Sequence, residues 1–212
     1  MGRARVILQS DFPYNISARC INREWFDLPM PQVWQIFCEE LAETVQEHEM
    51  KIHSFVLMSN HFHLIVSTPK ANISKCMHRF MSRSSRRLTR QGNRINETFA
   101  GRHFKCILHA HNYYLNAYKY NYRNPVTAGV CNAVEEYPYS TLPIVMGLQP
   151  NLIPIEEDLT YNSDPVGTVA WLNQTPDLQK QEAARYGFKR QFFQSKKCRL
   201  TNRYILGEYD TL

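Results

Sequence analysis

The chain has 212 residues, a length sufficient for one domain with a substantial hydrophobic core. Its 43% hydrophobic and 21% charged residues are ordinary for a globular protein, which excludes a disordered or fibrous chain. No apolar run approaches the ~20 residues that a membrane-spanning helix needs. The first residues also lack the apolar core of a signal peptide, so we expect a cytoplasmic protein, nucleoid-associated when bound to DNA, without a membrane partner.

Positive charge is concentrated in two stretches of the chain. Between Lys70 and Arg123 there are twelve Lys or Arg residues but a single acid, Glu97. Seven more Lys or Arg residues and no acid lie between Arg185 and Arg203. Because a solvated helix face usually mixes both signs of charge, this distribution favours a polyanionic partner such as nucleic acid.

Hydrophobic periodicity predicts the secondary structure in chain order. The predicted strands cover 14–20, 52–58, 62–67 and 102–108, and the predicted helices begin near Pro31, Asn72 and Asn112, the last ending before Pro125. This order is that of a ferredoxin-like (RRM-like) split βαβ fold with an added helix. We therefore predict an α+β protein with an antiparallel sheet and helices packed on one face.

The composition shifts to Pro, Asn and acids around residues 147–167, which is typical of a connector. The predicted organisation is one domain over residues 1–147, with a connector and a basic, mainly helical C-terminal extension over residues 148–212.

Two histidines, His61 and His63, stand two residues apart at the start of a predicted strand. Residues at this spacing point to the same face of a sheet, with Cα atoms about 6.6 Å apart, so the two imidazoles can converge on one divalent ion. Imidazole is a softer ligand than Mg²⁺ prefers, and such a site also needs an oxygen ligand. Two ordinary histidines without a metal are the alternative.

The third predicted helix is rich in tyrosine. Tyr120 and Asn124 are four residues apart and share one helix face, where a phenol and an amide can provide a nucleophile and an oxygen ligand. Tyr118 and Tyr122 lie close by, so Tyr122 is a second candidate nucleophile. Core packing is the alternative for each of these tyrosines.

The second predicted helix carries arginines on the side opposite its apolar face, which fits contacts to a DNA backbone. The expected DNA-binding residues are Arg79, Arg83, Arg86, Arg87, Arg90, Arg102, Lys105, Lys119 and Arg123. Phe104, Tyr113 and Tyr114 are candidates for stacking on bases, with packing as the alternative.

Four segments resemble one protein family, in the same order and at the same separations. Residues 58–64, Met-Ser-Asn-His-Phe-His-Leu, resemble the Met-Pro-Asn-His-x-His-Leu segment of the REP-associated tyrosine transposases, a branch of the single-tyrosine HUH (His-hydrophobic-His) transposases. Residues 120–130, Tyr-Asn-Tyr-Arg-Asn-Pro-Val-Thr-Ala-Gly-Val, resemble that family's Tyr-Ile-His-Leu-Asn-Pro-Val-x-Ala-Gly-Leu. Residues 101–105 and 137–141 also match. Ser59 replaces the usual proline, which loosens the turn without removing a ligand.

This resemblance implies a metal-dependent enzyme that nicks and rejoins single-stranded DNA at hairpin-type repeats. His61, His63 and Asn124 would bind Mg²⁺ or Mn²⁺, and Tyr120 would attack phosphorus to give a 5′-phosphotyrosine intermediate. A free tyrosine has a pKa of about 10, so Tyr120 needs activation, for which Lys119, Arg123 and the ion are candidates. Family members act as monomers or as homodimers, and the sequence leaves both open.

The alternative from another class is a non-catalytic nucleic-acid-binding module on the same fold. It would leave the joint presence of His61, His63 and Tyr120 unexplained, and the aromatic signature of RNA-recognition motifs is absent from the sequence. A metal-dependent hydrolase that uses water as the nucleophile is a further alternative. Formation of a covalent protein–DNA adduct distinguishes the transposase from both.

Overall fold

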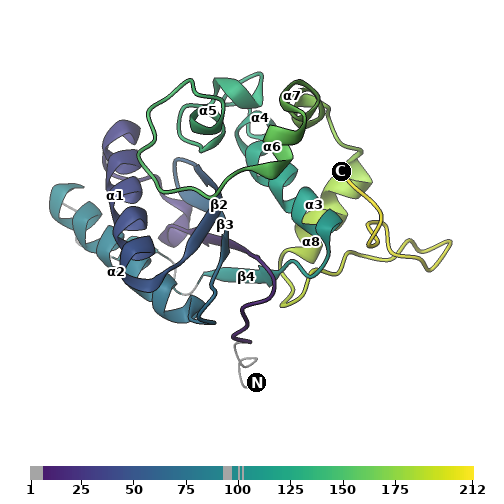
Figure 1. The fold of residues 1–212 in the computed structure, drawn as a ribbon, viewed down its shortest axis with the longest axis horizontal. Helices are drawn as coiled ribbons and strands as arrows, with labels where there is room; N and C mark the ends of the chain where they lie inside the picture. The colour runs from purple at the N-terminus through teal and green to yellow at the C-terminus, as the bar shows by residue number, and fades with distance from the viewer. Residues whose placement is uncertain (1–6, 93–96, 100, 102) are drawn as a thin grey trace.

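The computed structural model describes residues 7–92, 97–99, 101 and 103–212 of the chain (Figure 1). The strands are β1 (Tyr14–Arg19), β2 (Lys51–Leu57), β3 (His61–Ser67) and β4 (Phe104–Ile107). The helices are α1 (Met30–His48), α2 (Ile73–Gly92), α3 (His111–Tyr122), α4 (Asn124–Thr127), α5 (Leu142–Val145), α6 (Leu159–Ser163), α7 (Pro165–Asn173) and α8 (Leu178–Gly187), with short 3-10 helices η1 (Ile21–Arg23) and η2 (Val134–Glu136). Among the described residues, none of these helices is long and apolar enough to cross a bilayer.

The four strands form one antiparallel sheet in the order β2-β3-β1-β4 (Figure 1). Helix α1 connects β1 to β2, and α2 connects β3 to β4, so each helix joins strands that are not neighbours. This is the split βαβ arrangement of the ferredoxin-like fold, and it confirms the predicted α+β class. The two central strands, β3 and β1, have neighbours on both sides.

One face of the sheet is covered by α1 and α2 and holds an aromatic core. The ring of Phe62 on β3 lies 5.9 Å from that of Phe37 on α1 and 5.5 Å from that of Phe80 on α2. All three side chains are fully buried, and their edge-to-face contacts add to the hydrophobic stabilisation. Because side chains alternate along a strand, the residues on either side of Phe62 point away from these helices.

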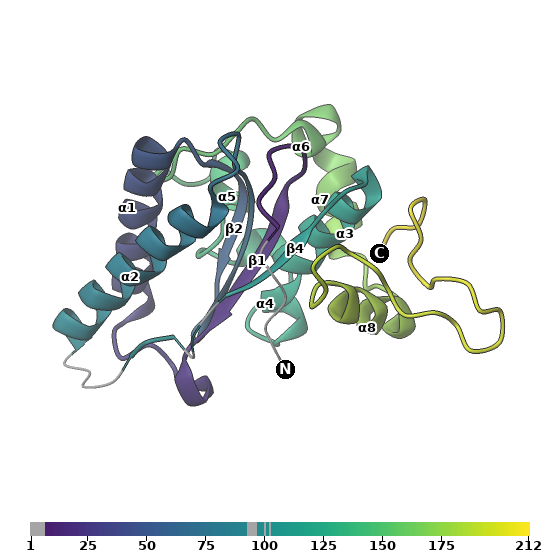
Figure 2. The same cartoon turned by 90° about the horizontal axis from the view of Figure 1, so that it is seen from below.

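The opposite face is partly covered by α3 and α8, which lie across the sheet from α1 and α2 in both views (Figures 1 and 2). Val56, Ile65 and Cys106 form an apolar strip on this face and pack in one cluster with Tyr118 of α3 and Ala184 of α8. The sequence predicts helices on one face only. The structure adds this second layer because the apolar strip also needs a cover.

The main difference from the predicted element ends is at the end of α3. This helix ends at Tyr122, and Asn124 begins the short helix α4. Pro125 stands in the first turn of α4, where its missing N–H leaves no helical hydrogen bond unmade. The Arg123 N–H still donates to the Lys119 carbonyl at 2.9 Å, so the chain keeps its helical course and Asn124 stays about one turn after Tyr120.

Residues 148–212 pack against the residues that precede them. Ile155 forms an isolated bridge with Ile52 of β2, and Phe192 forms one with Ile107 of β4. The extension is helical in α6, α7 and α8, and irregular after α8. The two parts therefore share contacts at both edges of the sheet, and the domain boundary near residue 147 stays a prediction.

Candidate active site

His61 and His63 project from β3 on the sheet face that α3 partly covers. Their ring centroids are 5.1 Å apart. The Nε2 atom of His61 lies 3.3 Å from Oδ1 of Asn124, and the Nε2 atom of His63 lies 3.1 Å from Nδ2 of the same amide. The structure therefore brings together the three residues predicted as metal ligands, with both Nε2 atoms directed at one amide group.

Burial keeps both imidazoles in the neutral form. Burial, and to a lesser extent the charge of Arg19, lowers the pKa of His61 to about 4. The pKa of His63 lies well below its ordinary value, chiefly because of burial and also because of His61 and Arg19. A neutral imidazole has a free nitrogen lone pair, which is the form that binds metal.

These donors fit a divalent ion only with additional oxygen ligands. Within the described parts of the chain, His, Cys, Asp and Glu side chains nowhere gather in a group of three or more suited to an ion. Two imidazoles and the amide oxygen of Asn124 are thus the protein ligands that converge here, and water or phosphate oxygens would complete the shell. The Nδ1 atom of His63 is buried without a hydrogen-bond partner among the described residues, so packing holds this ring in place.

Helix α3 places Tyr120 beside the two histidines. A buried hydrogen bond of 3.0 Å, which the Asn121 amide donates to Oδ1 of Asn15 on β1, fixes the helix on the sheet. The ring centroid of Tyr120 lies 5.8 Å from that of His63. On its other side, the ring of Phe188 lies 5.1 Å from it. The phenol is therefore held between the sheet and the end of α8.

The neighbouring tyrosines face the protein core. The hydroxyl of Tyr122 is hydrogen-bonded to Thr141 at 2.8 Å, and the hydroxyl of Tyr118 donates to Asp158 at 2.7 Å. Both side chains are almost fully buried. Of these three tyrosines, Tyr120 is the one that lines the cavity at the histidine pair.

A cavity of about 300 Å³ opens onto the sheet at the histidine pair. Its floor consists of cross-strand neighbours: Arg19 of β1 is paired with His61, and Ser17 is paired with His63 on one side and Phe104 on the other. Directly paired residues of adjacent strands point to the same face of a sheet. Phe104 is 61% exposed, so an apolar ring is open to solvent in the same cavity as the histidines.

The rim of this cavity carries positive charge from two distant parts of the chain. Arg19 and Arg23 come from β1 and η1, and Arg185 and Lys189 come from α8 and the residues after it. Among the described residues that line the cavity there is no Asp or Glu. Burial raises the pKa of Tyr120, and the charges of Arg185 and Arg19 partly offset that effect. A cation-lined cavity of this kind suits a phosphodiester.

Lys119 and Arg123 are engaged inside the protein. Lys119 is 1% exposed, and its ammonium donates to the Leu212 carbonyl at 3.2 Å. Arg123 is 6% exposed and donates to two backbone carbonyl oxygens at the end of α7. Their burial corrects the expectation that these two residues contact DNA. Neither residue lines the cavity at the histidine pair, whose cations are Arg19, Arg23, Arg185 and Lys189. Arg123 instead lines a neighbouring cavity of about 240 Å³ that Tyr120 also lines.

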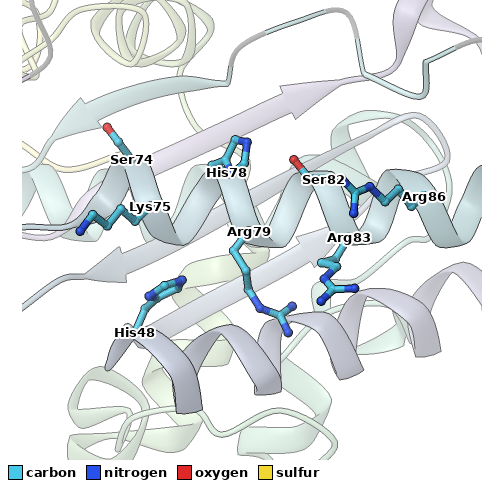
Figure 3. Close-up of a pocket in the computed structure, with 8 residues that line it drawn as sticks. All are labelled: His48, Ser74, Lys75, His78, Arg79, Ser82, Arg83 and Arg86. Carbon is cyan, nitrogen blue, oxygen red and sulfur yellow. The ribbon is translucent and has the colours of Figure 1, made fainter.

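The arginines of α2 fall into two groups, and the first group pairs with α1. The side chain of Arg79 is 9% exposed and directed towards α1 (Figure 3), where it bonds to the carboxylates of Glu40, Glu43 and Glu47. Arg87 bonds to Glu39 at 2.6 Å. The charges of Arg79 and Arg87 are therefore neutralised within the protein, which corrects their predicted role in DNA binding.

The second group, Arg83, Arg86 and Arg90, is exposed and makes no ion pair with a described residue. Arg83 and Arg86 line a groove of about 580 Å³ along α2 (Figure 3). Lys105 is paired with Ile16 and therefore points to the same side of the sheet as α2. These residues lie across the sheet from the histidine pair. Arg102, which the sequence also predicts to bind DNA, lies outside the described residues.

Sequence reasoning missed Arg19, and it did not count Arg185 among the expected site residues. The sequence does hold a signal for Arg19. Because side chains alternate along a strand, Arg19 lies on the same face of β1 as Asn15 and Ser17, opposite to the face of the buried Ile16. For Arg185 the sequence holds no such signal, because its position beside Tyr120 depends on how α8 packs against α3.

Comparisons with known proteins agree with this geometry. A family model described as IS200-like transposase matches residues 15–125, more than half of the chain. Among solved structures, a REP-associated tyrosine transposase bound to a REP hairpin matches with a TM-score of 0.59 and 19% identity, over 74% of this chain and 93% of that chain. A suspected transposase from Deinococcus radiodurans R1 reaches a TM-score of 0.39 with 14% identity, over 54% of this chain and 89% of that chain. The comparison with curated proteins gives no match.

The structural match to the hairpin-bound protein supports the fold described above. At 19% identity it supports the fold alone. The match to the family model is more specific, since it runs from β1 to the first turn of α4. It therefore includes His61, His63, Tyr120 and Asn124. The chain belongs to the IS200-like transposase family.

Proposed function

We propose that this chain nicks and rejoins single-stranded DNA at hairpin-type repeats, with Tyr120 as the nucleophile. The observation that carries the proposal is the convergence of His61 and His63 on the amide of Asn124, with the ring of Tyr120 5.8 Å from that of His63. An imidazole pair, an amide oxygen and a phenol beside a cation-lined cavity are the groups that phosphoryl transfer to tyrosine requires.

In the proposed reaction the phenolic oxygen of Tyr120 attacks the phosphorus of one phosphodiester. A bond forms between this oxygen and phosphorus, the bond from phosphorus to the 3′-oxygen breaks, the phenolic proton leaves, and the 3′-oxygen takes up a proton. The products are a 5′-phosphotyrosine and a free 3′-hydroxyl. Because the phosphoester bond is retained on the enzyme, attack by a 3′-hydroxyl rejoins the strand without ATP.

His61, His63 and Asn124 would hold a Mg²⁺ or Mn²⁺ ion, which when bound polarises the phosphate as a Lewis acid. The side chains of the protein prepare the ligands, the nucleophile and the DNA for this reaction. Burial keeps the imidazoles neutral, and the contact with Phe188 restricts the Tyr120 ring. The ring of Phe104 is open for a base to stack on.

The proposed substrate is a DNA hairpin with a flanking single strand. The REP-associated tyrosine transposase among the solved structures is bound to a REP hairpin. Contacts outside the cavity would come from the exposed Arg83, Arg86 and Arg90, and from Lys105. Because Tyr120 and the histidine pair of one chain share a cavity, the proposal needs no second copy, and it is compatible with a monomer or a homodimer. We expect the enzyme to act in the cytoplasm, on the nucleoid.

The test is covalent adduct formation. Purified protein is incubated with 5′- or 3′-labelled single-stranded hairpin DNA and Mn²⁺ or Mg²⁺, and the products are separated on a denaturing gel. The wild type is expected to give an adduct that carries the 3′ label, because the tyrosine is joined to the 5′-phosphate of the downstream fragment. Tyr120→Phe is expected to give neither adduct nor cleavage, with an affinity for DNA within a few-fold of the wild type. Tyr122→Phe is the matched control, because it removes the hydroxyl of a tyrosine on the same helix whose side chain faces the core.

Other results would support other functions. Cleavage without an adduct would favour water as the nucleophile. Tight binding without cleavage in any ion would favour the non-catalytic binding module. An adduct that persists in Tyr120→Phe and disappears in Tyr122→Phe would move the nucleophile to Tyr122.

A further inference from the structure

Two arginines, one from the sheet and one from α8, line the cavity without a hydrogen-bond or ion-pair partner among the described residues. Arg19 is the direct cross-strand neighbour of His61, and Arg185 lies in the last turn of α8. Arg79 and Arg87 of the same chain pair with carboxylates of α1, whereas no Asp or Glu is among the described residues that line the cavity of Arg19 and Arg185.

The position of Arg185 follows from the packing of α8. Ala183 and Ala184 are fully buried in the cluster that includes α3. At the end of the helix, a Cβ atom on Gly187 would come within 2.7 Å of the Phe193 ring, so glycine is needed for this close approach. Arg185 and Phe188 are three residues apart and share one face, and Phe188 contacts Tyr120.

Arg185 also lines a second cavity, of about 240 Å³, together with Tyr120, Asn124, Arg123 and Glu182. Arg185 and Tyr120 are thus common to both cavities. Both guanidinium charges act on the phenol of Tyr120, and an anion bound at this phenol would be attracted by both. The planar fork of arginine matches the non-bridging oxygens of a phosphate.

We propose that Arg19 and Arg185 form a clamp that binds the phosphate group attacked by Tyr120. Each guanidinium donates hydrogen bonds to a non-bridging oxygen, so the C-terminal extension supplies a substrate-binding residue to the active site. This inference rests on the proposed function, which identifies the bound phosphate as the one that Tyr120 attacks. Arg185 lies outside the residues matched by the family model, which end at residue 125, and no comparison assigns it a role.

The first test measures binding and needs no cleavage. Affinity for a single-stranded hairpin oligonucleotide is measured by fluorescence anisotropy at several salt concentrations, with Tyr120→Phe as the parent protein. For a single-stranded contact the slope of log K against log salt should become shallower by about 0.7 in Arg185→Gln and in Arg19→Gln. Lys51→Gln is the control. It also removes one positive charge, but Lys51 lies at the start of β2, is exposed and forms an ion pair with Glu156. It should leave the slope unchanged.

The second test measures the reaction. At saturating DNA, Arg185→Gln should slow adduct formation by about 10²-fold, as loss of one donor to a transition-state oxygen does. Arg185→Lys should recover part of the rate, because it keeps the charge and loses the fork. Once the cleaved position is mapped, a neutral methylphosphonate placed there should abolish the difference in affinity that Arg185→Gln causes, whereas one placed several nucleotides away should preserve it.

The outcomes separate the clamp from the proposed function. If Arg185→Gln matches Lys51→Gln in salt slope and in rate, the clamp is overturned even though the wild type forms an adduct. If the wild type forms no adduct in any ion, the proposed chemistry is overturned, and the salt slope still decides whether Arg19 and Arg185 bind the DNA backbone. Circular dichroism and thermal melting of each variant establish that it is folded.

Discussion

Replacement of Arg79 by glutamine tests whether this arginine serves the fold or the DNA. Its guanidinium bonds to three α1 carboxylates, of which only Glu40 is buried, at 4% exposure. In Arg79→Gln, the Glu40 carboxylate keeps one cation, Arg87 at 3.3 Å. Removing one partner of a buried ion pair costs about 3–5 kcal/mol, and the remaining contact to Arg87 places the expected loss at about 3 kcal/mol.

This loss is large enough to measure by thermal unfolding. For a chain of this length, 1 kcal/mol corresponds to about 2–4 °C in Tm, so Arg79→Gln should lower Tm by about 6–12 °C. Arg83→Gln is the matched control on the same helix. Because Arg83 is exposed and has no ion pair with a described residue, its replacement should change the free energy of unfolding by at most about 0.5 kcal/mol.

The two variants should show the opposite order in DNA binding. Below its melting temperature, Arg79→Gln should bind a hairpin oligonucleotide like the wild type, whereas Arg83→Gln should make the salt dependence slightly shallower. Removing the whole pair in Arg79→Met with Glu40→Leu should recover much of the lost stability, because no buried carboxylate is left. A Tm of Arg79→Gln equal to that of the wild type, together with weaker DNA binding, would refute the reasoning.

Three further predictions concern the cavity and the ion pairs between α1 and α2. Phe104→Ala should weaken single-stranded DNA binding by about 1–3 kcal/mol in anisotropy titrations, because a base stacks on this exposed ring; Tyr209→Ala, outside the cavity, should have no effect. Asn124→Ala should raise the Mg²⁺ concentration that gives half-maximal adduct formation, and Asn124→Asp should lower it, since a carboxylate is the stronger oxygen ligand. If neither variant changes this Mg²⁺ concentration, Asn124 is not a ligand. Hydrogen bonds to Arg87 and Arg79 lower the pKa of Glu39 and of Glu47 from 4.5. Because the folded-state pKa is the lower one, this stabilisation is complete above about pH 4.5 and lost as pH falls through the folded-state values. The free energy of unfolding measured in urea should therefore drop in acid, and less steeply in Glu39→Gln.

The sequence by itself determined the sheet and the core of the candidate site. Alternation and helical spacing are imposed by backbone geometry, so they mark β1 to β4 and the three long helices locally. The same geometry places His61 and His63 on one face and sets Asn124 one helical turn after Tyr120. Each of these relations spans four residues or fewer, and none depends on how the elements pack.

The charge pattern was less informative, because a sequence counts cations without their partners. Arg79 and Arg87 belong to the basic stretch, yet the acidic face of α1 neutralises them. Lys119 and Arg123 stand close to Tyr120 in the sequence, yet both are buried. Neighbours on a helix point in different directions, so adjacency to Tyr120 in the sequence does not place a cation in the cavity of the histidine pair.

Only the tertiary structure decided which phenol meets the histidines and which cations face it. The docking of α3 on β1, through the bond between Asn121 and Asn15, selects Tyr120 over its neighbours. The packing of α8 on α3 then brings Arg185 to the same cavity. These contacts join residues that are far apart in the chain and are fixed by the shape of buried surfaces, and such shape leaves no periodic signal in the sequence.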